Sequence, residues 1–599
     1  MLSLKIKEAA LQSLQQLYPE HTFTIDQISV NETKSEFKGD YTIVLFPFVK
    51  MLRCKPDEIG QKLGQHLIEN QASLFTEFQL LSGFLNLSVR DSFFIALLQQ
   101  NWHNVSFGTS ALQHKKVMIE YSSPNTNKPL HFGHLRNIFL GYALSNILKE
   151  AGKDVVKANL INDRGIHICK SMVAWQRYAQ GATPESTGIK GDHLVGDYYV
   201  RFNDVYKAEI AALVASGMDE KQAEKEAPIM QEAQQMLRLW EAGDQEVYQL
   251  WQTMNSWVYD GFAVSYKRLG VDFDKMYYES NTYLLGKSIV EEGLSKGILF
   301  RKEDNSVWID LTADGLDQKL LLRGDGTSVY MTQDIGTAVL KYNDCQLDQS
   351  VYVIADEQNY HMQVLKLILS KLGEPCSDGI FHLSYGMVEL PSGRMKSREG
   401  TVGDADDMMD EMLRMAQEQT EQAGKTEGFS SDELVQLYNT IGMGALKFYL
   451  LRVDPKKKMI FDPKESIDLH GFTATFIQYA HARICSILRK EQLPLMPSVQ
   501  QFEGFVAQAA LTKGEKDILL ALERYPSIIA DAATEMNPSV ICNYTFQLAQ
   551  LFNSFYDQHS IAKAEDEEKK QLRLMMIIMT AQTMRQSMRL LGIQMPEKM

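Results

Sequence analysis

The chain has 599 residues, a formal net charge of −15 and a hydrophobic content of 45%. Single hydrophobic cores seldom grow beyond roughly 250–300 residues, so this length predicts several domains. No uninterrupted apolar run reaches the roughly 18 residues that a membrane span needs, which argues against a membrane protein. The acidic balance argues against a protein that coats nucleic acid without specificity, although a local basic face could still bind one folded RNA.

The cysteines and the N-terminus indicate the cellular compartment. The chain contains no C-x-x-C pair, so we expect neither a structural zinc site nor a disulfide scaffold. Residues 1–8 resemble an amphipathic helix and lack the apolar core of a signal peptide. These features predict a cytoplasmic protein without structural zinc. The six cysteines are Cys54, Cys169, Cys345, Cys376, Cys485 and Cys542.

Residues 1–110 are predicted to form a first, α+β domain. Residues 40–45 and 84–89 are rich in β-branched and aromatic side chains, which predicts strands. Apolar periodicity predicts helices over 56–70 and 91–100.

From about residue 111 the pattern changes to strands alternating with helices, which is typical of parallel βαβ units. In such a sheet, ligands bind beyond the carboxyl ends of the strands, where the strand order reverses. A long, charged and mostly helical segment over about 170–319 interrupts the alternation. The predicted strands are 117–121, 154–161, 329–331 and 350–354, with a helix over 135–149.

The last part of the chain, from about residue 434, is predicted to be helical. Residues 573–591 are strongly apolar and rich in methionine, and Gly592 stands where a C-terminal cap is expected. Methionine fills irregular gaps in protein cores, so this pattern predicts a buried helix rather than a cofactor site.

The most informative segment, 120–137, lies at a predicted strand-to-helix junction. It holds His131 and His134 three residues apart, with Gly133 between them. Residues at this spacing share a helix face, so both histidines can contact one ligand, and the glycine leaves room for a ring against the backbone. Unpaired N–H groups at a helix N-terminus favour phosphate. The segment therefore predicts a site for a phosphorylated ligand.

A second segment, 393–401, is a compact basic loop flanked by glycines. It contains Arg394, Met395, Lys396 and Ser397. Together the two segments resemble the HIGH and KMSKS signature pair of class I aminoacyl-tRNA synthetases. The residues around the first motif are most similar to those of the arginyl-tRNA synthetase family.

The resemblance implies a multidomain α/β fold. A Rossmann-like class I synthetase catalytic domain would span 111–430, split by a helical insertion at about 170–319. A tRNA-elbow-binding α+β domain would precede it at 1–110. A linking helical segment would follow at 431–470, and an all-helical anticodon-binding domain at 471–599.

The resemblance also implies roles in the activation of arginine, in which a carboxylate attacks the α-phosphate of ATP. The protein must position the reactants and stabilise charge. For His361 a structural role is an equal alternative to ATP binding. The implied ATP-binding residues are His131, Gly133, His134, His361, Met395 and Ser397, and the implied catalytic residues are His131, His134, Lys128, Arg394 and Lys396.

The basic loop departs from the family's usual pattern. When it is aligned as K-M-S-K-S, Arg394 replaces the first lysine and Ser397 replaces the second, which is expected to stabilise the transition state. Arginyl enzymes commonly lack that second lysine and carry one just before the first histidine motif. Lys128 stands there, so it is predicted to supply the charge, with Lys396 as the alternative.

Selection of arginine needs a site for a planar cation, which a carboxylate recognises best in bidentate geometry. Tyr330 and Asp334 are four residues apart, so they would face one pocket if a helix starts after Tyr330. The same spacing occurs in the arginine pocket of the family, and the alternative is a solvated Asp334. The implied arginine-binding residues are Glu120 and Asn125 for the α-amino group, with Tyr330, Asp334 and Gln358.

Aromatic side chains stack on the unpaired bases of single-stranded RNA. The likeness to helical anticodon-binding domains predicts that Tyr479, Asn553 and Tyr556 contact tRNA, with helix-core packing as the alternative for each. The implied partners are an arginine tRNA, L-arginine and ATP, with Mg²⁺ in the ATP substrate complex. The protein is expected to be a monomer that needs no membrane.

Two other functions remain open at this point. The first is another class I synthetase such as the cysteinyl enzyme, which would carry zinc-ligating cysteines near the site; only Cys169 is near. The second is a catalytically silent, synthetase-like RNA-binding protein. Such a protein would be expected to have lost one of His131, His134 or Asp334, and all three are present.

Overall fold

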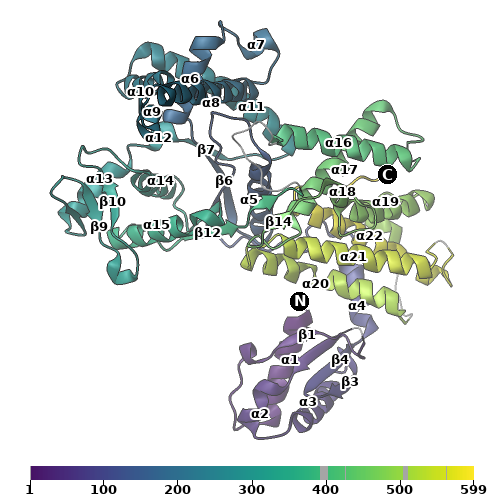
Figure 1. Cartoon of the computed structure of the whole chain (residues 1–599). Helices are drawn as coiled ribbons and strands as arrows, with labels where there is room; N and C mark the ends of the chain where they lie inside the picture. The colour runs from purple at the N-terminus through teal and green to yellow at the C-terminus, as the bar shows by residue number, and fades with distance from the viewer. Residues whose placement is uncertain (1, 35, 392–402, 425, 503–509, 562) are drawn as a thin grey trace.

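The computed structural model describes residues 2–34, 36–391, 403–424, 426–502, 510–561 and 563–599. Figure 1 shows a small N-terminal domain, a parallel sheet surrounded by helices, and a group of C-terminal helices. The predicted loop residues Arg394, Met395, Lys396 and Ser397 lie outside the described residues. Within the described ranges, no helix is long and apolar enough to cross a membrane.

The N-terminal domain contains a four-stranded antiparallel sheet in the order β1-β2-β4-β3. The predicted strands are confirmed as the two central strands, β2 and β4. The edge strands β1 and β3 were not predicted, because their residues are mostly exposed or half-buried and lack a clear apolar pattern. The elements are α1 (Leu2–Leu17), β1 (Val30–Glu32), β2 (Tyr41–Val44), α2 (Phe46–Leu52), α3 (Pro56–Asn70), β3 (Phe75–Leu81), β4 (Phe84–Val89) and α4 (Asp91–Asn101).

The central sheet has five parallel strands in the order β12-β11-β5-β6-β7. The chain runs outward from β5 through β6 to β7 and then returns to β11 on the other side, so the order reverses between β5 and β11. The strands are β5 (Lys116–Glu120), β6 (Asp154–Ile161), β7 (Lys275–Tyr278), β11 (Gln349–Ala355) and β12 (Ile380–Tyr385). The main helices around them are α5 (Phe132–Glu150), α14 (Tyr330–Cys345) and α15 (Asn359–Leu372).

The predicted strand at 329–331 is wrong. Val329 is extended, but Tyr330 is the first residue of α14. Val-Tyr-Met has local β propensity, whereas the residues that follow place Met331, Ile335 and Ala338 on one buried helical face. The longer helical period therefore overrides the short local preference.

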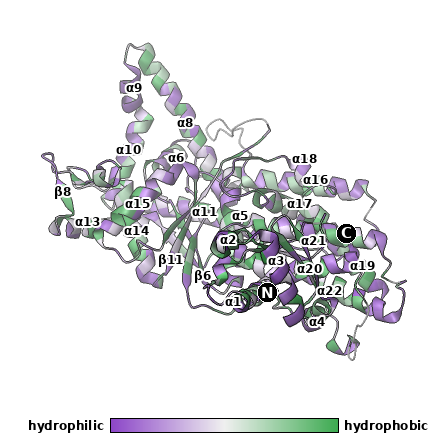
Figure 2. Cartoon of the chain, turned by 90° about the horizontal axis from the view of Figure 1, so that it is seen from below, coloured by the Kyte–Doolittle hydropathy of each residue, from purple (hydrophilic) through white to green (hydrophobic). Residues whose placement is uncertain are grey.

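The segment between β6 and α14 contains more than helices. Helices precede and follow β7, which joins the central sheet, and β8, β9 and β10 form a separate antiparallel sheet. Figure 2 shows α8 and α9 projecting from the body of the molecule. The elements are α6 (Ile166–Tyr178), α7 (Pro184–Thr187), α8 (Gly191–Ala215), α9 (Glu220–Glu226), α10 (Pro228–Glu241), α11 (Gln245–Leu269), α12 (Glu279–Thr282), α13 (Gly286–Ser295), β8 (Leu299–Arg301), β9 (Val307–Ile309) and β10 (Lys319–Leu322).

Among the residues described after β12, the chain is helical apart from turns, loops and a short parallel pair, β13 with β14. The methionine-rich segment is confirmed as a buried helix, because Met575, Met576 and Met579 are each at most 2% exposed. The elements are β13 (Val388–Glu389), α16 (Ala405–Gln422), α17 (Ser431–Leu451), β14 (Met459–Ile460), α18 (Pro463–Ser466), α19 (Ala474–Lys490), α20 (Lys513–Thr534), α21 (Ser539–Gln558) and α22 (Glu567–Leu590).

The N-terminal domain contacts the C-terminal helices through polar groups on α20. The hydroxyl of Tyr41 donates to Glu523 over 3.1 Å, and the ammonium group of Lys516 lies 2.9 Å from Asp40. These contacts join the first domain to the last one.

Candidate functional site

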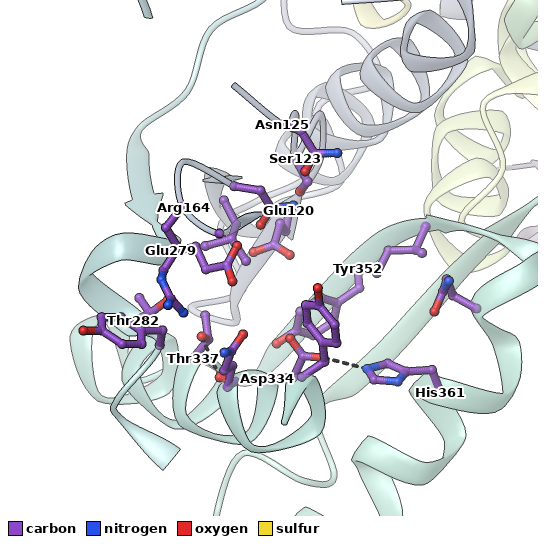
Figure 3. Close-up of a pocket in the computed structure, with 18 of the residues that line it drawn as sticks. Glu120, Ser123, Asn125, Arg164, Glu279, Thr282, Asp334, Thr337, Tyr352 and His361 are labelled. Atoms are coloured by element: carbon purple, nitrogen blue, oxygen red, sulfur yellow. Dashed lines mark hydrogen bonds and ion pairs between the residues drawn. The ribbon is translucent and has the colours of Figure 1, made fainter. Parts of the chain in front are cut away.

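A cavity of about 1490 Å³ lies at the carboxyl ends of β5, β6 and β11, next to the point where the strand order reverses. This is where open parallel sheets bind ligands. Figure 3 shows Glu120, Asp334 and His361 arranged around it. The predicted residues that line it are Glu120, Asn125, His131, Gly133, His134, Tyr330, Asp334, Gln358 and His361.

The two histidines stack at the start of α5. Their ring centroids are 3.8 Å apart, and the backbone N–H of His131 donates to Nδ1 of His134 over 3.0 Å. Since Nδ1 of His134 accepts a hydrogen bond, the proton of the neutral ring sits on Nε2. His131 occupies the N-cap position with an extended backbone. Both rings are therefore fixed beside the unpaired N–H groups of the helix.

Burial makes both histidines neutral at pH 7. It lowers the pKa of His131 to about 4, with a further contribution from the charge of Lys128. Burial, the adjacent His131 and Lys128 hold the pKa of His134 well below its ordinary value. Neutral rings can donate hydrogen bonds to phosphate oxygens, but they cannot neutralise the charge of those oxygens.

Lys128 is half-buried, and burial lowers its pKa from the ordinary value for lysine. Its charge is close enough to depress the pKa of both histidines. Its side chain does not line the cavity directly. Among the described residues, Lys128 is thus a cation whose charge acts on both histidines.

Tyr330 and Asp334 lie one turn apart at the start of α14. Tyr330 is 76% exposed, and Asp334 contacts Nε2 of His361 over 2.6 Å. The hydrogen bond to Asp334, opposed by burial, raises the pKa of His361 above its ordinary value. Gln358 stands just before α15, on the same side of the cavity as His361.

Glu120 already has a charged partner. Its carboxylate forms a buried ion pair with Lys341 of α14, and the lysine also lies over the ring of Tyr352 at 4.7 Å. Asn125 is exposed and forms an isolated bridge with Asn162. The buried pair ties the end of β5 to the helix that carries Asp334, so the central strand and α14 keep a fixed spacing.

Glu279 is a cavity residue that the sequence reasoning missed. Burial raises its pKa to about 7, with Asp163 and Asp334 raising it further and Arg164 opposing them. Asp163 fixes this corner, because its carboxylate accepts hydrogen bonds from the backbone and hydroxyl of Ser280 at 2.8 and 2.7 Å. Glu279 follows β7 directly, so recognising that strand in the sequence would have pointed to it.

The three predicted tRNA contacts come together in the C-terminal helices, around an arginine. The guanidinium of Arg483 lies 5.0 Å from the ring centres of both Tyr479 and Tyr556. Its Nη1 donates to the side-chain oxygen of Asn553 over 2.8 Å. Tyr556 is 39% exposed, so this cluster reaches the surface.

Three family models match the chain. The model described as tRNA synthetases class I (R), catalytic domain, matches residues 96–462. The chain belongs to the arginyl-tRNA synthetase family. The Arginyl tRNA synthetase N terminal domain matches residues 4–89, and the DALR anticodon binding domain matches residues 477–599.

Curated relatives match along all or nearly all of their length. A protein of Amoebophilus asiaticus named Arginine–tRNA ligase is 48% identical over 100% of both chains. A protein of Flavobacterium psychrophilum with the same name is 50% identical over 96% of both chains. These matches confirm the arginyl resemblance and do not support the cysteinyl alternative.

Solved structures support the fold. Thermus thermophilus arginyl-tRNA synthetase superimposes with a TM-score of 0.80 at 23% identity, over 100% of both chains. The enzyme of Plasmodium falciparum gives a TM-score of 0.77 at 17% identity, over 100% of this chain and 99% of its own. The predicted class I architecture, with its N-terminal domain and helical C-terminal domain, is confirmed.

Proposed function

We propose that the chain uses ATP to activate L-arginine and transfers it to the 3′ end of an arginine tRNA, releasing AMP and pyrophosphate. The observation that carries the proposal is that one cavity contains both the histidine pair and the Tyr330–Asp334–Gln358 set. The full-length relatives named Arginine–tRNA ligase support the same reaction.

His131 and His134 would bind the phosphates and the adenosine side of ATP. As neutral rings each would donate one ring N–H, from Nε2 in the case of His134, while Gly133 admits the nucleotide against the backbone. ATP would arrive with Mg²⁺ as its substrate complex. Lys128 would supply positive charge to the transition state, with Lys396 as the alternative, and Arg394 and its neighbours would bind the pyrophosphate.

Asp334 would receive the guanidinium of arginine in bidentate geometry, with Tyr330 as an aromatic wall and Gln358 as a further acceptor. Glu279 offers a second carboxylate in the same cavity. The α-amino group would contact Asn125 and Glu120. Because Glu120 is also paired with Lys341, its contact with the amino group would be shared.

In the C-terminal domain, Tyr479, Asn553 and Tyr556 would contact the anticodon bases. Arg483 supports this assignment because it holds the two rings and the amide in one cluster at the surface. The N-terminal domain would contact the tRNA elbow. The proposed form is a monomer that acts in the cytoplasm, and light scattering should give a mass near the chain's 68.1 kDa.

The direct test is ATP–pyrophosphate exchange with each amino acid, with and without total tRNA. Only arginine should support exchange, and the purified chain should charge an arginine tRNA. A chain that binds this tRNA but exchanges with no amino acid, even when tRNA is present, would instead be the catalytically silent RNA-binding protein.

Asp334→Asn should raise the KM for arginine by about 10- to 100-fold, because hydrogen bonds to a charged group are worth about 1.5–3 kcal/mol. The KM for ATP should change little. Asp344→Asn is the matched control, since Asp344 lies on the same helix but bonds to Tyr277 outside the cavity lining. An unchanged arginine KM in Asp334→Asn would refute the pocket assignment.

The arginine KM should rise as pH falls through the raised pKa of His361. Below that pKa the imidazolium pairs with Asp334 and offsets the charge that the guanidinium needs; above it the carboxylate is fully available. His361→Gln should flatten this part of the pH profile. A profile with the same acidic rise in the variant would show that another group titrates.

Lys128→Ala should lower kcat for aminoacylation more than it raises the KM for ATP, as expected for a contact made chiefly in the transition state. Loss of one preorganised charge-stabilising group typically costs about 10²–10³ in rate. Lys396→Ala should be milder in the same steady-state assay with saturating tRNA. The reverse order of the two variants would assign the charge to the basic loop instead.

Arg483→Met should raise the KM for tRNA roughly 5- to 100-fold, because stacking on an aromatic ring is worth about 1–3 kcal/mol per base. The rings of Tyr479 and Tyr556 would lose the cation between them. Arg489→Met on the same helix is the control, since the guanidinium of Arg489 donates to the backbone carbonyl of Glu597 over 2.9 Å, away from the Tyr479–Tyr556 cluster. Equal effects of the two variants would argue for helix stability rather than tRNA contact.

A further inference from the structure

The start of α8 contacts two segments beside the histidine motif. One is Pro129, which precedes His131, and the other is residues 404–406. His193 of the first turn of α8 faces Asp404 and Asp406, at the start of α16. Gly196, one turn later, lies against Pro129: a Cβ added at Gly196 would be 2.8 Å from its Cδ. One helix of the insertion therefore contacts the residues before His131 and the residues at 404–406 together.

Both ring nitrogens of His193 face carboxylates. Nδ1 lies 3.3 Å from Asp404, and Nε2 lies 3.0 Å from Asp406. A neutral imidazole has only one N–H, so it would turn a lone pair toward one of these two anions. The geometry therefore fits the imidazolium form, which donates from both nitrogens.

Lys190 completes the cluster from the N-cap of α8. Its ammonium group lies 2.6 Å from Asp406, 3.1 Å from the buried Asp192 and 2.6 Å from the hydroxyl of Ser265. The ligand atoms of Asp192, His193 and Asp406 are close enough together to suggest a metal site. The ammonium group of Lys190 already lies within 3.1 Å of both Asp192 and Asp406, so these carboxylates have a cation of the protein as their partner.

Asp404 connects this cluster to the histidine motif. It caps α16 by accepting from the N–H of Asp407 over 2.8 Å, and its backbone forms an isolated antiparallel bridge with His131. The N–H of Ala405 donates to the carbonyl of Leu130 over 2.8 Å. Movement of Asp404 would therefore displace the backbone of His131, at the edge of the cavity.

Arg136 makes a separate contact between α5 and the loops that precede β13 and β14. Arg136 of α5 is fully buried, and its guanidinium donates to the carbonyls of Gly386 and Lys457 at 2.5 and 2.9 Å. These two hydrogen bonds hold the backbone just before β13 and β14 against α5. Residues 404–406 are held by side chains from outside α5: His193 of α8 and Lys190 at its N-cap face their carboxylates, and the hydroxyl of Ser265 on α11 donates to Asp406 over 3.1 Å.

We propose that His193 and Lys190 are positioning residues for arginine activation: they hold the Asp404–Ala405 backbone against Leu130–His131 and so set the place of His131 and Lys128. The proposal rests on the proposed function, because it needs those two side chains to act on ATP. Neither positioning residue lines the cavity itself.

The proposal predicts a pH dependence with a definite sign. The bond to Asp406, partly opposed by burial, raises the pKa of His193 above its ordinary value, with Asp192 and Asp404 adding to the rise. Below that pKa both contacts exist, and above it one is lost, so kcat should fall on the alkaline side. The charged groups that face His193 are Asp192, Asp197, Asp404, Asp406 and Lys190.

The test compares His193→Gln, His193→Arg and the full-length parent in ATP–pyrophosphate exchange with saturating tRNA, from pH 6 to pH 10. His193→Gln should lower kcat about 10- to 100-fold, as expected when reacting groups shift by a fraction of an ångström to one ångström. The arginine KM should stay within about twofold, because α14 and α15 are not part of the cluster. His193→Arg, which keeps a charge and two donors, should recover most of kcat and lack the alkaline fall.

His382→Gln is the matched control, because the ring of this half-buried histidine of β12 bonds to the carbonyl of Ile354, outside the carboxylate cluster. It should behave like the parent. Unchanged kcat in His193→Gln, or a loss of kcat with the parent's alkaline fall intact, would overturn the positioning role. Circular dichroism melting identifies a variant that has simply unfolded. In that case Asp406→Asn provides the second measurement, because it should also lower kcat. A parent-like kcat in Asp406→Asn would overturn the proposal. Failure of the parent to exchange with arginine would instead refute the proposed function.

Discussion

The junction between β5 and α5 is the constraint on which the site depends. β5 is the central strand, next to the point where the strand order reverses, and α5 begins within twelve residues of its end. The backbone there must expose N–H groups, and the stacked rings of His131 and His134 occupy the same place. Three contacts connect this junction to its surroundings: Lys341 ties Glu120 to α14, Arg136 donates to the carbonyl of Gly386 before β13, and His193 of α8 faces Asp404.

Burial at this junction decides where charge must come from. It removes the charge from both histidines, so they orient an anionic ligand without neutralising it. The chain as a whole is acidic, which makes bulk attraction of a polyphosphate unfavourable. Positive charge must therefore be local, and Lys128 has a depressed pKa because it is held in the same buried region.

Two kinds of feature could be predicted from the sequence: helices with a long apolar period, and motifs whose residues lie close together in the chain. The predicted helices α3 and α5 carry apolar residues over several turns, and the histidine motif lies within one turn. Strands β7 and β8 are only three or four residues long, too short to carry a period. Glu279 and Lys341 became visible only through the fold, because β7 and α14 had to be placed beside the cavity before either side chain could be assigned to it. The residues of the basic loop were predicted from the resemblance, and their roles stay predictions.

The first turn of α8 shows the same limit, because its contacts near the histidine motif could not be predicted from the sequence. In sequence, residues 190–196 lie about sixty positions after the histidine motif and more than two hundred before Asp404. In the fold, Gly196 lies against Pro129 and His193 lies against Asp404. The far end of α8 projects away from the body, whereas its first turn is buried against the catalytic domain (Figure 2). One helix therefore meets two different requirements. Its outer part must remain helical and compatible with water, while its first turn must present a cation at fixed distances from two carboxylates. The sequence pattern predicts the half-exposed helix. It does not predict the place of the cation, because that place depends on carboxylates that come near α8 only when the chain folds.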